Sequence, residues 1–249
     1  TVISQLIGMV WVVSHFCKKD STVHFEGKVW KMKGRIVESI FAIGMSPFLM
    51  NLAACFIVII INQGLKKYGG DLAIGAFGIV NRLVFIVVMI VMGLNQGMQP
   101  IAGYNFGAKL YGRVNKVLRL TIIYATAVTS FGFLVGMLVP DLVVGIFTSD
   151  AELTELSVTG LRITVMFFPI IGFQMVTSNF FQSIGMAGKA IFLSLTRQML
   201  ILLPCLLVLP QFFGVAGVWY SMPVSDLLAS LIALVMLVCQ FRKFRTSPL

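Results

Sequence analysis

Hydrophobic residues form long, continuous stretches along this chain, separated by short polar segments. An α-helix rises about 1.5 Å per residue, so roughly 20 apolar residues are needed to cross about 30 Å of bilayer hydrocarbon. Six stretches reach that length and predict transmembrane helices over residues 40–64, 72–100, 120–139, 156–184, 191–213 and 215–241. The stretches do not alternate and are too long for barrel strands. The pattern therefore predicts an all-α membrane protein whose main part is a six-transmembrane-helix bundle.

A further apolar segment, residues 1–16, precedes the six spans and is too short to cross the membrane by itself. It lacks the basic start and the small-residue cleavage site of a signal peptide. We therefore predict that it is the end of another transmembrane helix in a longer polypeptide. Residues 17–39 mix basic and apolar side chains, which predicts a linker at the cytoplasmic surface.

Basic residues are distributed unevenly between the two sides of the predicted bundle. Fifteen of the 19 lysines and arginines fall on one side, in residues 17–39, near the second-to-third and fourth-to-fifth connections, and after residue 241. The other side carries the acidic residues Asp141, Asp150, Glu152 and Glu155. The positive-inside rule then places the C-terminus in the cytoplasm and predicts a multi-pass protein of the cell (inner) membrane. Topology thus accounts for the net charge of +10, and no nucleic acid partner is needed.

Composition excludes a soluble domain and gives no sign of an enzyme. Charged residues make up 11% of the chain and hydrophobic residues 58%, whereas soluble domains carry about 25% charged residues. The four cysteines show no metal-binding or redox spacing, so neither a disulfide framework nor a metal site is predicted. No catalytic motif and no phosphate-binding loop are present.

Two charged residues fall near the middle of predicted spans. Arg82 and Asp226 each lie about ten residues from the outer end of a span, so both are expected at a depth of about 15 Å. A charge at the bilayer centre costs about 3 kcal/mol on insertion scales and normally finds a partner. We therefore predict a buried Arg82–Asp226 pair, which either joins two helices or takes part in transport.

Amide side chains also occur within the spans. We interpret these amides, together with a neighbouring methionine and arginine, as candidate lining of a substrate cavity, although hydrogen bonding between helices would also explain single amides. The candidate lining residues are Met50, Asn51, Asn81, Arg82, Gln174 and Asn179.

The stretch GLNQGMQPIAGYNFGAK, residues 93–109, ends the second predicted span with amides, glycines and a proline. Gln96 and Gln99 share one helical face, and Pro100 removes a backbone donor and disfavours helical geometry at the residue before it. We therefore predict a helix break at Gln96, Gln99 and Pro100 that takes part in gating at the cytoplasmic mouth. A purely structural break is the alternative.

The same stretch resembles the signature of the multidrug and toxic compound extrusion family in the second span of that family's C-terminal half. Four further blocks match the family in order: IGMSPFLMNLAA, GIVNRL, FFQSIGMAGKAIFLSLTRQMLILLP and GVAGVWYSMPVSD. The resemblance implies two six-helix lobes that expel cationic or amphiphilic compounds in exchange for Na⁺ or H⁺. It implies that residues 1–16 end the preceding lobe, 17–39 link the lobes, 40–241 form the C-terminal lobe and 242–249 form a cytoplasmic tail.

The resemblance further implies a partner and a coupling ion. The partner is the N-terminal lobe of the same polypeptide, and the substrates are small organic cations. Some branches of the family carry coupling carboxylates in helices where this chain has Asn51 and Gln174, which cannot titrate. Either the carboxylate lies in the N-terminal lobe, which we favour, or Asp226 has taken that role; no resident cofactor is expected. The alternatives to an antiporter are a flippase for lipid-linked saccharides and a passive channel or structural module.

Overall fold

The computed structural model describes residues 2–17 and 34–246, which form two compact units, Thr1–Pro47 and Phe48–Leu249. The first unit contains helix α1 (Val2–Phe16) and the beginning of α2 (Gly34–Gly107). Helix α1 is mostly apolar and none of its residues is buried. Six of the residues predicted as linker, 34–39, are therefore helical, and linker residues 18–33 lie outside the described part of the chain.

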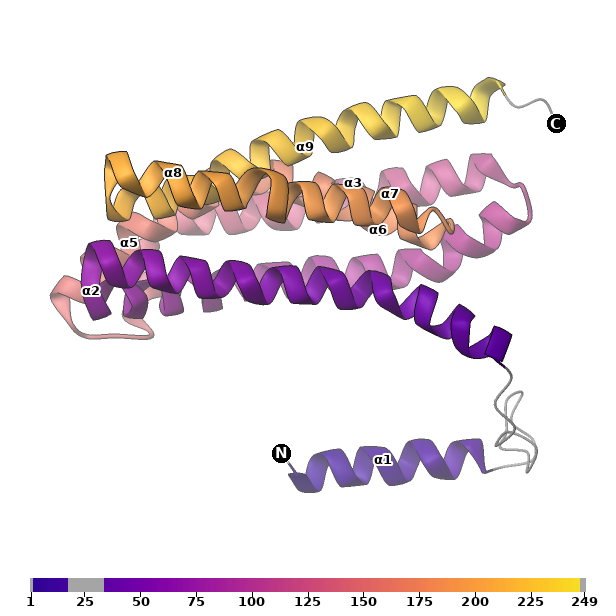
Figure 1. Cartoon of the computed structure of the whole chain (residues 1–249), viewed down its shortest axis with the longest axis horizontal. Coiled ribbons are helices and arrows are strands. Elements are labelled where there is room, and N and C mark those ends of the chain that lie inside the picture. Colours follow the sequence, from indigo (N-terminus) through magenta and orange to yellow (C-terminus); the bar gives the residue numbers. More distant parts are fainter. Residues whose placement is uncertain (1, 18–33, 247–249) are drawn as a thin grey trace. The chain divides into compact units, whose positions relative to one another are not determined.

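Helix α2 consists of two helices that meet at Gly70. Its backbone there has φ 68° and ψ −162°, a conformation that glycine adopts without the steric cost of a side chain. The chain turns back at this point, and the second half of α2 runs alongside the first (Figure 1). Ile57, Ile61 and Leu65 from the first half pack in one cluster with Phe77 and Val80 from the second. The predicted spans 40–64 and 72–100 therefore form a helical hairpin.

Four further passes complete the second unit. The third pass is α3 (Tyr111–Leu138), which a short helix α4 (Pro140–Gly145) follows. The fourth is the bent pair α5 (Ala151–Val165) and α6 (Phe168–Ser183). The fifth consists of the continuous α7 (Ala187–Leu195), η2 (Thr196–Leu202) and α8 (Leu203–Phe213), and the sixth is α9 (Val215–Thr246). Counting α2 as two passes and α5–α6 as one, the described residues make six passes of apolar helix, which confirms the predicted fold class. Figure 1 shows these long helices lying side by side.

Local sequence explains how the fourth pass begins and where it bends. The Asp150 carboxylate accepts hydrogen bonds from the backbone N–H groups of Glu152 and Leu153, so it caps the first turn of α5. Pro169 lies in the first turn of α6, where its missing N–H is tolerated. The axes of α5 and α6 differ by 55° at this point. The predicted span 156–184 is thus one bent pass rather than a straight helix.

A π-helical segment, η2, interrupts the fifth pass. In a π-helix each N–H bonds to the carbonyl five residues earlier. Such segments are rare in proteins, and those that occur are often found at functional sites. The Leu203 N–H follows this pattern and donates to the Gln198 carbonyl. Hydropathy does not distinguish α from π geometry, so the sequence predicted only a continuous span over 191–213.

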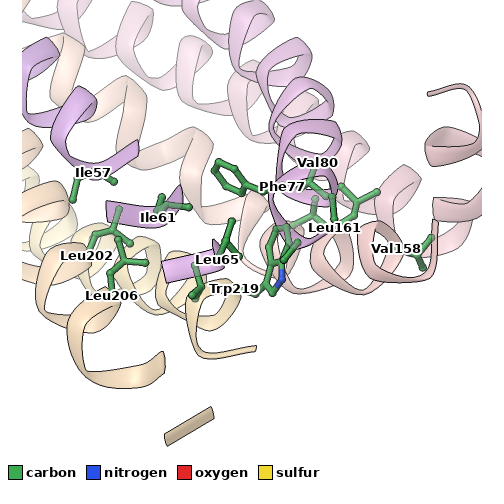
Figure 2. Packing of buried hydrophobic residues seen from close by; sticks show 14 of the residues in the cluster. Ile57, Ile61, Leu65, Phe77, Val80, Val158, Leu161, Leu202, Leu206 and Trp219 are labelled. Carbon is green, nitrogen blue, oxygen red and sulfur yellow. The ribbon is translucent and has the colours of Figure 1, made fainter. Parts of the chain in front are cut away.

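Two hydrophobic clusters hold the second unit together. In the first, Phe77 of α2 contacts Trp219 of α9, with ring centroids 5.9 Å apart. Leu202 and Leu206 belong to the same cluster and lie near Ile57 and Ile61 (Figure 2). The second cluster contains Phe180 and Phe181 of α6 together with residues of α2, α3, α7 and α9. Burial of large side chains stabilises the lobe by about 25 cal/mol per Å² relative to an aqueous reference, but within a bilayer close packing carries more of the stability.

Candidate functional site

The buried carboxylate of Asp226 pairs with Arg197. Asp226 is 4% exposed and lies about 17 Å along α9 from its start, near the middle of the membrane. Its Oδ1 is 2.7 Å from Nη2 of Arg197, which lies in η2 and has a side chain that is 32% exposed. The predicted Arg82–Asp226 pair is therefore wrong. Arg82 and Asp226 do lie at similar depths along their helices. The rotation of each helix about its axis decides which side chains meet, however, and α9 turns Asp226 toward η2.

Polar groups continue along η2 and α9 around this ion pair. The Ser230 hydroxyl donates to the Asp226 carbonyl at 2.6 Å. Thr196 Oγ1 and Gln198 Oε1, on either side of Arg197 in sequence, are buried and have no hydrogen-bond partner among the described residues. Buried polar atoms are usually paired. The π-helical segment therefore combines an ion pair with two unsatisfied oxygens inside the membrane-spanning region.

Arg82 lies on the surface of the lobe. It is exposed, as is its neighbour Asn81, and it lies about 18 Å along α2 from the turn at Gly70. Within residues 2–17 and 34–246, no carboxylate forms an ion pair with Arg82. Both polar side chains are thus directed away from the lobe interior at mid-membrane depth.

Asn51 is also exposed, but it does not lie at the depth of Arg82. About 27 Å of helix separates Asn51 from Gly69 along the first half of α2. Asn51 therefore lies toward the end of this helix that the predicted topology places on the cytoplasmic side. The backbone of Met50 is helical, and its side chain lies outside the described part of the structure.

The structure brings together two residues from different parts of the prediction. The Gln99 amide of α2 donates to the Asn179 carbonyl oxygen of α6 at 3.4 Å, and the Asn179 amide donates to the Met175 backbone carbonyl at 3.0 Å. Gln174 is 4% exposed and points into the lobe, so its position does not support a role in cavity lining. Gln96 is exposed. Gln99 and Asn179 therefore link two helices.

The predicted helix break at Pro100 is wrong, because α2 continues to Gly107. A proline removes one backbone hydrogen bond, which a long helix in a packed bundle tolerates. The close helix contact lies further on, at Gly103, where a Cβ atom would be 3.0 Å from the Ser183 backbone carbonyl. A Cβ on Gly93 or Gly97 would meet no atom within 4 Å, so no other helix of the described residues packs closely against these two glycines.

Sequence reasoning missed three groups. Arg197 was counted with the loop charges, because it lies only a few residues inside the predicted span. Asn95 is 2% exposed and neither of its amide atoms has a hydrogen-bond partner among the residues described. Lys189 donates to Gln240, near the C-terminal end of α9, and lies 5.3 Å from the Phe181 ring centroid. A helical-wheel comparison of α2 would have detected Asn95, since it shares the face of Val91 and Met98.

One apolar pocket of about 230 Å³ lies between α2, α3 and α5. Leu83, Val87, Phe131, Val165 and Phe168 contribute to its wall. None of the predicted site residues lines it. The polar candidates therefore lie on the surface of the lobe or at contacts between its helices, and they do not come together in this pocket.

Comparisons with known proteins agree on one family. A family model described as MatE matches residues 43–207. The multidrug export protein MepA of Staphylococcus aureus is 28% identical over 234 residues, covering 94% of this chain and 51% of MepA. MepA of Staphylococcus haemolyticus is 26% identical with the same coverage. The chain thus spans about half the length of these curated relatives.

Solved structures give the same picture. The MATE multidrug transporter DinF-BH, solved in complex with the dye rhodamine 6G, is 34% identical with a TM-score of 0.85, and the match covers 99% of this chain and 55% of DinF-BH. An outward-facing MATE family transporter of the MOP superfamily has a TM-score of 0.87 at 18% identity, with coverage of 99% and 56%. The second likeness concerns the fold alone.

Proposed function

The chain belongs to the MatE family, and from that premise we propose that it forms the C-terminal lobe of a secondary antiporter that exports cationic or amphiphilic drugs in exchange for Na⁺ or H⁺. It is a multi-pass membrane protein. The observation that carries the proposal is the exposed Arg82 at mid-membrane depth. Such a group requires water or protein beside it, because exposure to acyl chains is costly. A second lobe and a central cavity between the lobes provide both.

The relatives' length supports a two-lobe assembly. The curated relatives are about twice as long as the matched region, so they contain a segment large enough for a second lobe. Their function in multidrug export and the rhodamine 6G bound by DinF-BH make organic cations the substrate class that we propose for this protein. We place the C-terminus in the cytoplasm on the distribution of Lys and Arg.

We place the coupling carboxylate in the N-terminal lobe. Asp226 is the buried carboxylate of the described residues, and Arg197 already neutralises it. A cation that used Asp226 would have to displace a guanidinium. The lipid-linked saccharide flippase is the weaker alternative, because its pyrophosphate would require several uncompensated basic groups at the cavity, whereas Arg197 is already paired with Asp226.

We expect the full-length gene product to export rhodamine 6G in a manner that depends on an ion gradient. The protein would be produced in an efflux-deficient host, and dye retention measured while the Na⁺ and proton gradients are collapsed separately. Loss of export with one ionophore would identify the coupling ion. Unchanged dye movement after both gradients are removed would contradict the antiporter and support a passive channel. The empty host is the control for background dye loss.

Residues 1–249 produced alone are expected to give no gradient-dependent dye export, because one lobe provides only one wall of the cavity. Export should return when the remaining half of the gene is produced as a second polypeptide in the same cells. Equal amounts of both halves in the membrane would be checked by immunoblotting. Export by the isolated lobe at the level of the full-length protein would contradict the two-lobe proposal.

A further inference from the structure

One face of α3 is exposed along the helix and is apolar over most of its length. The exposed side chains recur every three or four residues, so they form a single stripe along the helix. The apolar part of this stripe consists of Leu120, Ile123, Tyr124, Ala127, Phe131, Leu134 and Leu138. Val114, Leu118 and Ala125 lie on the other side of the helix and are buried. Helix α3 therefore packs into the lobe on one side and leaves an apolar surface on the other.

The apolar part of this stripe is about as long as the hydrocarbon of a bilayer is thick. From Leu120 to Leu138 the helix rises about 27 Å, and the hydrocarbon measures about 30 Å. Exposed charges within the spans lie on other helices, at Arg82 of α2 and Arg162 of α5. A charged group inside the membrane faces water or protein, whereas an apolar surface can face acyl chains. We therefore assign the α3 stripe to the lipid-facing side of the lobe.

Two cations continue this stripe beyond its apolar part. Arg113 and Lys116 precede Leu120 at the same three- and four-residue spacing, and both are exposed. Along the helix axis Lys116 lies about 6 Å and Arg113 about 10 Å beyond Leu120. The headgroup region extends roughly 5–7 Å beyond the hydrocarbon on each side of a bilayer. Because lysine and arginine have long, flexible side chains, both charges can lie at the level of the lipid phosphates.

The connection between α2 and α3 adds further groups suited to this level. Lys109 lies in the connection, Arg119 lies at the edge of the stripe, and both are exposed. Tyr104, near the C-terminal end of α2, is 77% exposed. Tyrosine is enriched where hydrocarbon meets headgroups, because its ring is apolar and its hydroxyl is polar. Four cations and an exposed tyrosine thus lie near the same boundary.

These four cations have no counter-charge within the lobe. None of them forms an ion pair with a carboxylate of residues 34–246. The acidic residues nearest in sequence, Asp71 and Asp141, lie near the far ends of the second half of α2 and of α3. Positive charge in the first turns of a helix is also unfavourable, because the helix dipole is positive there. The positive-inside rule explains the side on which these cations occur, but it does not explain their alignment with the lipid-facing stripe.

We propose that the basic end of the α3 stripe binds an anionic phospholipid of the adjoining leaflet. Arg113 and Lys116 bind the phosphate, and an acyl chain of the same lipid lies along Leu120 and Ile123. Lys and Arg beside a transmembrane helix attract anionic headgroups, whereas a headgroup without net charge is attracted less. The lipid is a partner distinct from the exported compound, so this inference does not depend on the proposed export function.

Lipid binding to the purified full-length protein tests the site. Protein in detergent would be titrated with dioleoyl phosphatidylglycerol or dioleoyl phosphatidylcholine, and bound lipid counted by native mass spectrometry. We expect phosphatidylglycerol to bind more tightly. Arg113→Gln combined with Lys116→Gln should weaken its binding about thirtyfold, the change that corresponds to two cations near a membrane surface, and should leave phosphatidylcholine binding unchanged. Lys116→Gln alone should weaken it about fivefold, which keeps the test available if the double variant is unstable.

Controls separate a site from a general effect of charge. Lys66→Gln combined with Lys67→Gln makes the same change of charge on two exposed lysines near the turn at Gly70, and it should alter the binding of neither lipid. Arg113→Lys combined with Lys116→Arg keeps both charges and should keep the preference for phosphatidylglycerol. Glycerol phosphate carries the anionic group without acyl chains, so at the concentration of the lipid it should not compete.

Three results would overturn the assignment. Equal affinity of the unaltered protein for the two lipids would show that the stripe does not select a headgroup. An equal loss of phosphatidylglycerol in the Lys66 and Lys67 variant would show that net charge, and not this site, attracts the lipid. Competition by glycerol phosphate would identify a site for a free anion. Dye export would be unaffected as a test of the proposed function in all three cases.

Discussion

Replacing Asp226 by asparagine is expected to lower the stability of the folded protein by about 3 kcal/mol, because it leaves the Arg197 guanidinium without its counter-charge in the membrane. The loss should lie at the lower end of the range for buried pairs, since Arg197 is partly exposed and can reach polar surroundings. We expect less monodisperse protein in detergent and a lower Tm, measured by fluorescence-detected size-exclusion chromatography after heating.

A double variant distinguishes an ion pair from a coupling carboxylate. Asp226→Leu combined with Arg197→Met removes both charges, and similar-sized apolar residues often replace a buried pair with little loss of stability. We expect this variant to regain most of the Tm lost in Asp226→Asn and to keep gradient-dependent rhodamine 6G export per molecule. A stable double variant that had lost coupling would instead assign Asp226 to the coupling ion.

Replacing Gly172 by leucine is expected to separate α6 from α3 and to destabilise the lobe by about 3 kcal/mol. A Cβ atom at Gly172 would lie 2.9 Å from the backbone carbon and oxygen of Ala125 and 2.7 Å from Thr129 Oγ1. Backbone atoms cannot move aside as the end of a flexible side chain can, so the helices themselves would have to shift. The yield of folded protein and its Tm would be measured as above.

Gly112→Ala is the matched control for this substitution. Gly112 is also helical, in the first turn of α3, but it is exposed and a Cβ there would meet no atom within 4 Å. Alanine has a higher helix propensity than glycine by about 1 kcal/mol, so Tm should stay the same or rise slightly. A Gly172→Leu protein as stable as the unaltered one would mean that α3 and α6 are not in the close contact described.

Helix hydropathy explains why so much of the architecture was predictable. The number and approximate ranges of the passes follow from the length of each apolar run, and the structure contains a pass for each predicted span. Errors occurred at the ends, where the chain stays helical beyond the apolar run. The second half of α2 extends to Gly107, and in its final turns the Asn105 amide N–H donates to the Ile101 backbone carbonyl.

The partners of polar side chains were predicted less well. Depth placed Arg82 and Asp226 at the same level, yet Asp226 pairs with Arg197, because each helix presents only one face to each neighbour. Gln99 and Asn179 were assigned different roles, and the structure joins them across α2 and α6. Neither result can be read from spacing along one helix.

The sequence by itself determined that the chain is a six-pass helical membrane protein with polar groups at mid-depth, because burial in lipid depends on the local run of side chains. Only the tertiary structure decided which face each helix turns to its neighbours, that Arg197 neutralises Asp226, and that Arg82 stays on the surface. Helix rotation and the π-helical register are set by packing among residues distant in the chain, and a linear pattern carries no record of either.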